Sequence, residues 1–141
     1  MQQLTPIEAR VFLLERPRTA KIASVRADGR PHVAPVWFDL DGDTIVFTTW
    51  HATVKAANIR RDPRISLCVD DEAPPFAFVL IEGIVTLSDD LEELRRWATR
   101  IAERYMGADL AESYGQRNGV PGELLVRVTP TKIIGQSGIA N

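Results

Sequence analysis

The sequence predicts a mainly β protein, a small barrel of six antiparallel strands with helices packed at its ends. Several segments alternate apolar and polar residues with the period of two that half-buried strands show. Two Asp-Gly pairs, at 28–29 and 41–42, stand between such segments and favour tight hairpin turns. A further segment begins with the wholly apolar run 76–81, which is typical of a strand covered on both faces.

Composition limits the class of protein. The chain has 141 residues, 26 % of them charged, and a formal charge of −2. This size predicts one domain over residues 1–141, and the near-neutral charge argues against a nucleic-acid partner. Cys68 is the only cysteine, so an intrachain disulfide is excluded and a zinc or other metal site is not expected. The sequence shows no signal peptide and no apolar run of bilayer length, so we expect a cytoplasmic protein with no membrane partner.

The N-terminal segment predicts a short amphipathic helix over residues 5–16. Thr5, Pro6 and Glu8 have the spacing of a capping box with proline at the first helical position. The apolar residues that recur at helical spacing form the face expected to be buried, and they are Ile7, Val11 and Leu14.

Three strands are expected next, over residues 20–25, 33–40 and 45–49. The two Asp-Gly turns join them, so they are expected to pair in chain order as a meander. Pro31 and Pro35 place the second strand at an edge or a bulge, where a missing N–H breaks no ladder bond.

A helix is expected over residues 53–61, because Asp62-Pro63 ends it. Its inward-facing residues are predicted to be Val54, Ala57 and Asn58.

The second half begins with strands over residues 64–69 and 76–87. One face of the longer strand is expected to line the core, and the other to meet a second surface, because water seldom covers such an apolar face. A last strand is expected over 124–128, continued over 131–134, and residues 135–141 are expected to form a loose tail.

Two helices are predicted between these strands, opened by the Asp-x-x-Glu spacings at Asp89 and Asp109. The first is expected to end near Tyr105 and the second near Asn118. The apolar face of the first helix is predicted to contain Leu91, Leu94, Ala98, Ile101 and Tyr105.

The segment from Thr48 to Lys55 is the candidate binding site. It joins the end of a strand to the start of a helix, so free helix N–H groups and the hydroxyls of Thr48 and Thr49 converge there, as anion binding requires. Lys55 lies in the first helical turn, where the helix dipole disfavours a cation and a bound phosphate removes that conflict. The alternative is that Lys55 simply extends into water.

Other polar side chains near this segment have two interpretations each. Arg60, Arg61 and Arg64 are either a solvated helix face or a cationic collar for a polyanionic ligand. His51 lies in the strand–helix loop and is a weak candidate for a proton donor, because its ordinary pKa is near neutrality.

The chain resembles a known superfamily in four segments, 28–38, 47–49, 55–67 and 82–83. The third segment contains the string Lys-x-x-Asn-x-Arg-Arg-Asp-Pro-Arg-x-Ser. Together they look like the pyridoxamine-phosphate-oxidase-like split β-barrel superfamily, and the string most resembles its deazaflavin-dependent (coenzyme F-420) and flavin reductase branch. The resemblance covers nearly the whole chain.

This resemblance implies a split β-barrel homodimer with two cofactor sites at the subunit interface. It implies that Thr48, Thr49 and Lys55 hold the cofactor phosphate, and that Phe78 of the partner subunit faces the same pocket. With this coenzyme, Arg60, Arg61 and Arg64 are expected to attract its carboxylate-rich tail, and which of them reach it stays open. The segment expected to run along the cofactor ring comprises Val33, Ala34, Pro35, Val36 and Trp37.

Two departures from the family pattern bear on the cofactor. Flavin-phosphate oxidases of this group carry an arginine where this chain has Val54, and a C-terminal Arg and His motif that residues 135–141 lack. Both departures argue against vitamin B6 oxidation, and Val54 in place of arginine favours coenzyme F-420 over flavin mononucleotide (FMN).

The resulting prediction is an F-420-dependent oxidoreductase that passes a hydride to an unsaturated or conjugated substrate. Trp37 and Trp50 are expected either to line the substrate face by stacking or simply to pack in the core or an interface. The first alternative is an FMN-binding flavoprotein of the same fold. The second alternative is a non-catalytic carrier or sensor of a flavin, a haem or a fatty acid.

Overall fold

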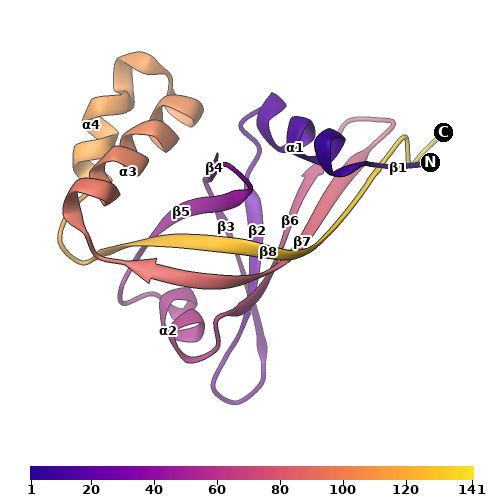
Figure 1. Ribbon diagram of the computed structural model, residues 1–141. Coiled ribbons are helices and arrows are strands. Elements are labelled where there is room, and N and C mark those ends of the chain that lie inside the picture. The colour runs from indigo at the N-terminus through magenta and orange to yellow at the C-terminus, as the bar shows by residue number, and fades with distance from the viewer.

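The computed structural model describes residues 1–141 and confirms a mainly β fold with four helices (Figure 1). The elements in chain order are β1 (Gln2–Gln3), α1 (Pro6–Glu15), β2 (Ala20–Val25), β3 (Pro31–Val36), β4 (Asp39–Asp41), β5 (Thr44–Trp50), α2 (Val54–Arg61), β6 (Arg64–Asp71), β7 (Ala77–Ser88), α3 (Leu91–Met106), α4 (Ala108–Asn118) and β8 (Glu123–Ser137).

The strands form one antiparallel sheet with the order β3-β2-β6-β7-β8-β5-β4, and β1 pairs with β8. There are eight strands where six were expected, because β1 and β4 are too short to show a period-two pattern. Both Asp-Gly turns are present, with Gly29 at φ 87° and Gly42 at φ 60°, the left-handed region that glycine adopts without strain.

The predicted meander is wrong. The segment 33–40 divides into β3 and β4, and these lie at opposite ends of the sheet order. The chain therefore leaves one edge of the sheet at Trp37 and joins the other edge at Asp39, which opens the split in the barrel. Pro31 and Pro35 lie on the edge strand β3, as their missing N–H groups require.

The predicted loose tail is also wrong up to Ser137. Residues 135–137 belong to β8, which pairs with β7 and with β1. A Cβ on Gly135 would lie 3.0 Å from the Leu4 side chain, so this end of β8 packs closely against the N-terminal segment. The two chain ends accordingly lie together in Figure 1.

Helix α1 has the predicted capping box but buries a different face. Thr5 Oγ1 accepts a hydrogen bond from the Glu8 amide at 3.2 Å, and Glu8 Oε1 accepts one from the Thr5 amide at 3.1 Å. The buried residues are Ala9, Phe12 and Leu13, whereas the predicted Ile7, Val11 and Leu14 are exposed. The helix is apolar on both sides, so spacing alone did not determine which row faces the barrel.

Helix α2 differs from prediction in a similar way. Its buried residues are Ala56, Asn58 and Ile59, while Val54 and Ala57 are exposed. The burial of Asn58 is confirmed, and its amide donates to Ser24 Oγ on β2 at 3.0 Å. This bond satisfies a polar group that would be costly to bury alone.

Helices α3 and α4 form a hairpin outside the barrel (Figure 1). Asp90, not Asp89, caps α3, and α4 starts at Gly107 without the side-chain cap expected of Asp109. Leu94, Ala98 and Ile101 are buried as predicted and Trp97 joins them, while Leu91 and Tyr105 are half-buried.

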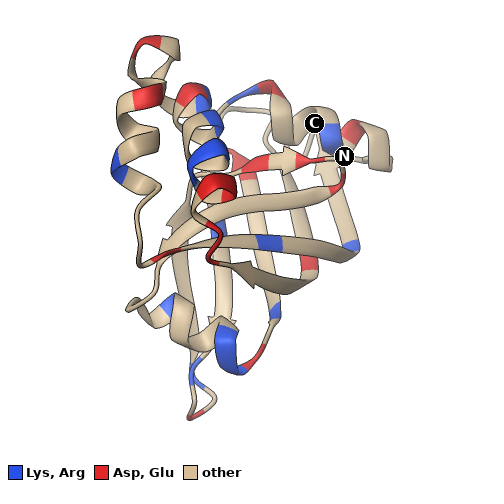
Figure 2. Cartoon of the chain, turned by 60° about the vertical axis from the view of Figure 1, so that its left-hand side comes forward, with Lys and Arg blue, Asp and Glu red and all other residues tan.

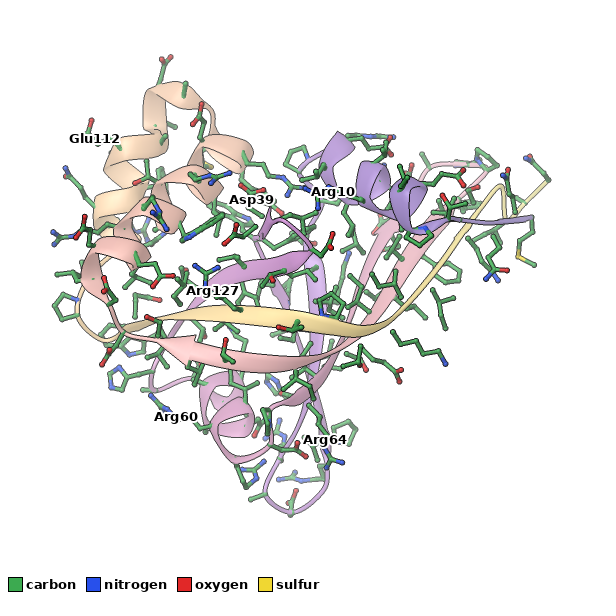
Figure 3. The ribbon with its side chains drawn as sticks, viewed as in Figure 1. Arg10, Asp39, Arg60, Arg64, Glu112 and Arg127 are labelled. Atoms are coloured by element: carbon green, nitrogen blue, oxygen red, sulfur yellow. The ribbon has the colours of Figure 1, made fainter.

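The core has two parts. Nineteen buried residues fill the barrel, and Val46, Leu94, Trp97 and Leu125 form a second cluster between the sheet and α3. Arg127 reinforces this junction, because it points from β8 toward α3 and bonds Glu93 there and Asp41 on β4 (Figure 3). None of the helices has the length and apolar character needed to span a membrane.

Candidate functional site

A cleft of about 260 Å³ lies where β5 ends, and residues of α2 and of the α3–α4 hairpin also line it. It brings together six of the predicted cofactor-binding residues from three elements of the sequence. They are Pro35, Val36 and Trp37 at the end of β3, Thr48 and Thr49 on β5, and Lys55 on α2.

The hydroxyl of Thr53 organises the strand–helix corner. Thr53 Oγ1 donates to the Trp50 carbonyl at 3.0 Å and accepts from the Ala56 amide at 3.1 Å, which caps α2. Thr49 Oγ1 lies 3.1 Å from the same oxygen, and because the Thr53 proton is already donated, Thr49 is the donor. Thr49 is 3 % exposed, so its hydroxyl holds the corner together, whereas that of Thr48 makes no bond within the chain.

Lys55 supplies the positive charge of the cleft. Burial lowers the pKa of its ammonium group, and the charge of Glu123 opposes that shift. The ammonium group makes no hydrogen bond within the chain, so all three of its donors remain available to a ligand.

Glu123 is the functional candidate that the sequence reasoning missed. It is the first residue of β8 and lies opposite Trp50 in the β5–β8 register. Burial raises the pKa of its carboxyl group, while the charges of Lys55 and His51 lower it. No local pattern marks this residue, because only the pairing of two strands distant in sequence brings it to Lys55.

Aromatic rings form the wall on the α3–α4 side. The ring of Trp37 stacks on Tyr105 with centroids 5.0 Å apart and an interplanar angle of 5°, and it lies 6.5 Å from the ring of Tyr114. The Tyr105 hydroxyl accepts from the Phe38 amide at 3.1 Å and donates to the Arg18 carbonyl at 2.6 Å. Trp37 therefore has a fixed orientation at the cleft.

The loop that follows β5 carries Trp50 and His51, whose rings are 4.6 Å apart. Trp50 lines the cleft and is 43 % exposed. His51 Nδ1 lies 3.0 Å from the Gly122 carbonyl, which can only accept, so this nitrogen carries a proton.

The three arginines that follow have partners within the chain. Arg60 donates to the His51 carbonyl at 2.9 Å, Arg61 donates to the Val25 carbonyl, and Arg64 pairs with Asp62 at 2.9 Å. Figure 2 shows basic residues on α2, and Figure 3 shows Arg60 and Arg64 projecting from the lower end of the molecule. None of the three lines the cleft.

The remaining predicted residues lie elsewhere. Ala34 faces Ile22 across the β2–β3 pair and does not line the cleft. Val33 lies on the outer face of the sheet, in a hollow of about 280 Å³ that also contains Leu80 and Ile134. Phe78 shares this outer face of β7 with Leu80, because residues two apart in a strand point the same way. The chain's own Phe78 is thus not part of its cleft.

Comparison with known proteins gives a direct match. A family model described as pyridoxamine 5'-phosphate oxidase matches residues 6–137. The chain belongs to the pyridoxamine 5'-phosphate oxidase family. The predicted resemblance is therefore confirmed.

Relatives of this family member include proteins named for coenzyme F-420. An F-420H(2)-dependent biliverdin reductase of Mycobacterium tuberculosis (strain CDC 1551 / Oshkosh) is 31 % identical over 100 residues, or 70 % of each chain. A conserved hypothetical protein of Mycobacterium tuberculosis has a structure with TM-score 0.80 and 26 % identity, over 92 % of this chain and 82 % of that one. The structure of an F-420 reductase has a TM-score of 0.70 and 28 % identity, over 87 % of this chain and 94 % of that one.

Proposed function

We propose that this member of the pyridoxamine 5'-phosphate oxidase family is an oxidoreductase that uses reduced coenzyme F-420. The observation that carries the proposal is the cleft itself: an unpartnered, half-buried Lys55 and the free hydroxyl of Thr48 lie beside the end of β3. The named relatives support F-420 as the coenzyme.

The residues of the cleft fit an anionic group. Lys55 and Thr48 would hold a phosphate, since an ammonium and a hydroxyl are both hydrogen-bond donors for its oxygens. Thr49 and Thr53 would position this corner rather than contact the phosphate, because their hydroxyls bond each other. When bound, the reduced coenzyme supplies a hydride, so the protein needs no nucleophile of its own.

The β3 segment and its aromatic neighbours would orient the ring system. The backbone at Pro35 and Val36 lies along the cleft, and Trp37 is held in place by Tyr105. Together with Trp50, these residues would hold a flat, conjugated substrate against the coenzyme and keep water away from it.

His51 is the candidate proton source. Because Nδ1 donates to the Gly122 carbonyl, Nε2 is the ring nitrogen left to exchange a proton with a bound molecule. A proton held at Nε2 would be the one available to the reduced product.

The outer face of the sheet supports a homodimer. Leu80 on β7 is 41 % exposed and lies beside Ile134 on β8, and Val33 on the edge strand β3 is 65 % exposed; all three line the same hollow. Exposed apolar side chains gathered in one hollow are rarely left in water. A second copy of the chain that covers this face would bring its Phe78 to the first copy. The family resemblance places Phe78 of the partner subunit there.

Fluorescence titration of the purified chain with F-420 and with FMN tests the proposal, followed by anaerobic turnover of reduced F-420 with biliverdin and other conjugated acceptors. We expect F-420 to bind more tightly than FMN and to be oxidised in the presence of an acceptor. Tight binding of FMN with none of F-420 would overturn the choice of coenzyme, and binding without turnover of any acceptor would favour a carrier.

A further inference from the structure

The cleft contains one positive and one negative side chain. Of the residues that line it, only Lys55 and Glu123 carry a charge at neutral pH, so the formal charge of its walls is zero. An anion that enters therefore meets one attractive and one repulsive group, not a cationic pocket.

No nearby arginine changes this balance by direct contact. Arg60 and Arg61 donate to backbone carbonyls, and Arg64 is neutralised by Asp62. Lys55 carries the only positive charge among the residues that line the cleft, and this charge, with that of His51, lowers the pKa of Glu123. One cation alone must thus offset both Glu123 and an incoming ligand.

Glu123 is held at this position by the sheet. Its amide donates to the Val120 carbonyl at 3.1 Å, and its backbone pairs with Trp50. Burial raises the pKa of its carboxyl group, which shows that water solvates this charge poorly and screens it weakly.

The charge of the ligand then decides how strongly Glu123 opposes it. A phosphomonoester such as FMN carries close to two negative charges at neutral pH, whereas a phosphodiester carries one. F-420 contains a phosphodiester. Lys55 and Glu123 together leave the cleft neutral, so a bound diester adds one uncompensated negative charge and a bound monoester adds nearly two.

We propose that Glu123 makes this cleft selective for phosphodiesters over phosphomonoesters. This inference rests on the proposed function, since it assumes that the anionic group of the coenzyme binds beside Lys55. It assigns to Glu123 the rejection of FMN, a role separate from holding the coenzyme.

Two flavin ligands test this role with the ring held constant. They are FMN and riboflavin 5'-(methyl phosphate), which differ by one methyl group and one charge. Their dissociation constants are measured by flavin fluorescence quenching with the full chain, at about pH 8, where the monoester is fully ionised. We expect the wild type to bind the methyl ester about tenfold more tightly than FMN, the ratio that about 1.4 kcal/mol produces.

Variants at Glu123 separate charge from shape. Glu123→Gln is expected to bind FMN more tightly, which brings the ratio of the two dissociation constants close to one. Glu123→Asp keeps the negative charge and is expected to retain the preference for the methyl ester. Glu112→Gln is the control, because Glu112 projects from α4 away from the body of the protein and should leave the ratio unchanged (Figure 3). Circular dichroism establishes that each variant is folded.

The inference is overturned if folded Glu123→Gln gains no FMN affinity, or if the wild type does not distinguish the two esters. Failure of the proposed function would show differently, as absence of F-420 binding or turnover by the wild type. The ratio for the flavin esters is measured without turnover, so the two failures can be told apart.

Discussion

Lys55 is the residue on which ligand binding depends most directly. It lies in the first turn of α2, where the helix dipole disfavours a cation, and burial further lowers the pKa of its ammonium group. A bound anion offsets part of both costs, because its negative charge favours the ammonium form and counteracts the helix dipole.

Replacing Lys55 by methionine tests this dependence. We expect Lys55→Met to weaken F-420 binding by about 1.5–3 kcal/mol, the range for a charge-assisted hydrogen bond. Methionine keeps most of the buried stem, so the unfolding free energy should change little. Arg96→Met, which also removes one positive charge but lies on the exposed side of α3 away from the cleft and the outer hollow, is the control. An unchanged dissociation constant in titration would contradict the site assignment.

Glu123 is expected to make the affinity for an anionic ligand depend on pH. Its carboxyl group has a raised pKa because it is buried, and a bound anion disfavours its ionised form further. Binding therefore takes up a proton, and affinity for a phosphodiester should rise as the pH falls from about 8 towards about 5.

The measurement uses riboflavin 5'-(methyl phosphate), whose own charge is constant over this range. The slope of log Kd against pH should be smaller in Glu123→Gln than in the wild type. Equal slopes in the two proteins would show that Glu123 does not titrate with binding.

At the scale of elements, the α3–α4 hairpin positions one wall of the cleft. Tyr105 on α3 and Tyr114 on α4 hold Trp37, and Ala98, Ile101 and Asn118 line the cleft directly. The two helices approach closely at Gly115, where an added Cβ would lie 2.9 Å from Thr99 Cα. This contact leaves no room for a larger side chain.

Gly115→Ala should separate the two helices. Because the clash involves backbone as well as side chain, we expect a loss of about 1–3 kcal/mol in unfolding free energy, measured by urea denaturation. Ser113→Ala on the exposed side of α4 is the control and should change it by less than about 0.5 kcal/mol. F-420 affinity should also fall in Gly115→Ala, since Trp37 loses its support. An unchanged midpoint of urea denaturation would contradict the prediction, because it would show that the two helices adjust without cost.

At the scale of the whole molecule, the sheet has two apolar faces. The inner face fills the barrel, and the outer face of β3, β2, β6, β7 and β8 presents a hollow that contains Leu80 on β7. In the strand register, Leu80 lies opposite Cys68 on β6 and opposite Ile134 on β8. The patch is thus continuous across strands, as an interface between copies requires.

Leu80→Asp tests the dimer. A charge in an apolar interface is costly to bury, so the variant should be monomeric by light scattering at concentrations where the wild type is dimeric. Gln116→Asp adds the same charge on exposed α4 and should leave the mass unchanged. If Leu80→Asp remains a dimer, the copies associate through another surface, and the exposed row Ile7, Val11 and Leu14 of α1 becomes the next to test.

The sequence by itself determined the local structures and the chemistry of the corner. The capping box at Thr5, both Asp-Gly turns, the edge position of Pro31 and Pro35 and the threonine–lysine segment all follow from interactions within a few residues. Such short-range preferences act before any distant contact forms, so they can be identified along the chain.

The tertiary structure decided what depends on distant pairing. It split 33–40 between two edges of the sheet, fixed residues 135–137 in β8, and chose the buried face of α1. It also separated the predicted site residues, since Val33 faces the outer side while Trp37 reaches the cleft. Glu123 enters the site only because β8 pairs with β5, and strand register is set by the packing of the whole sheet.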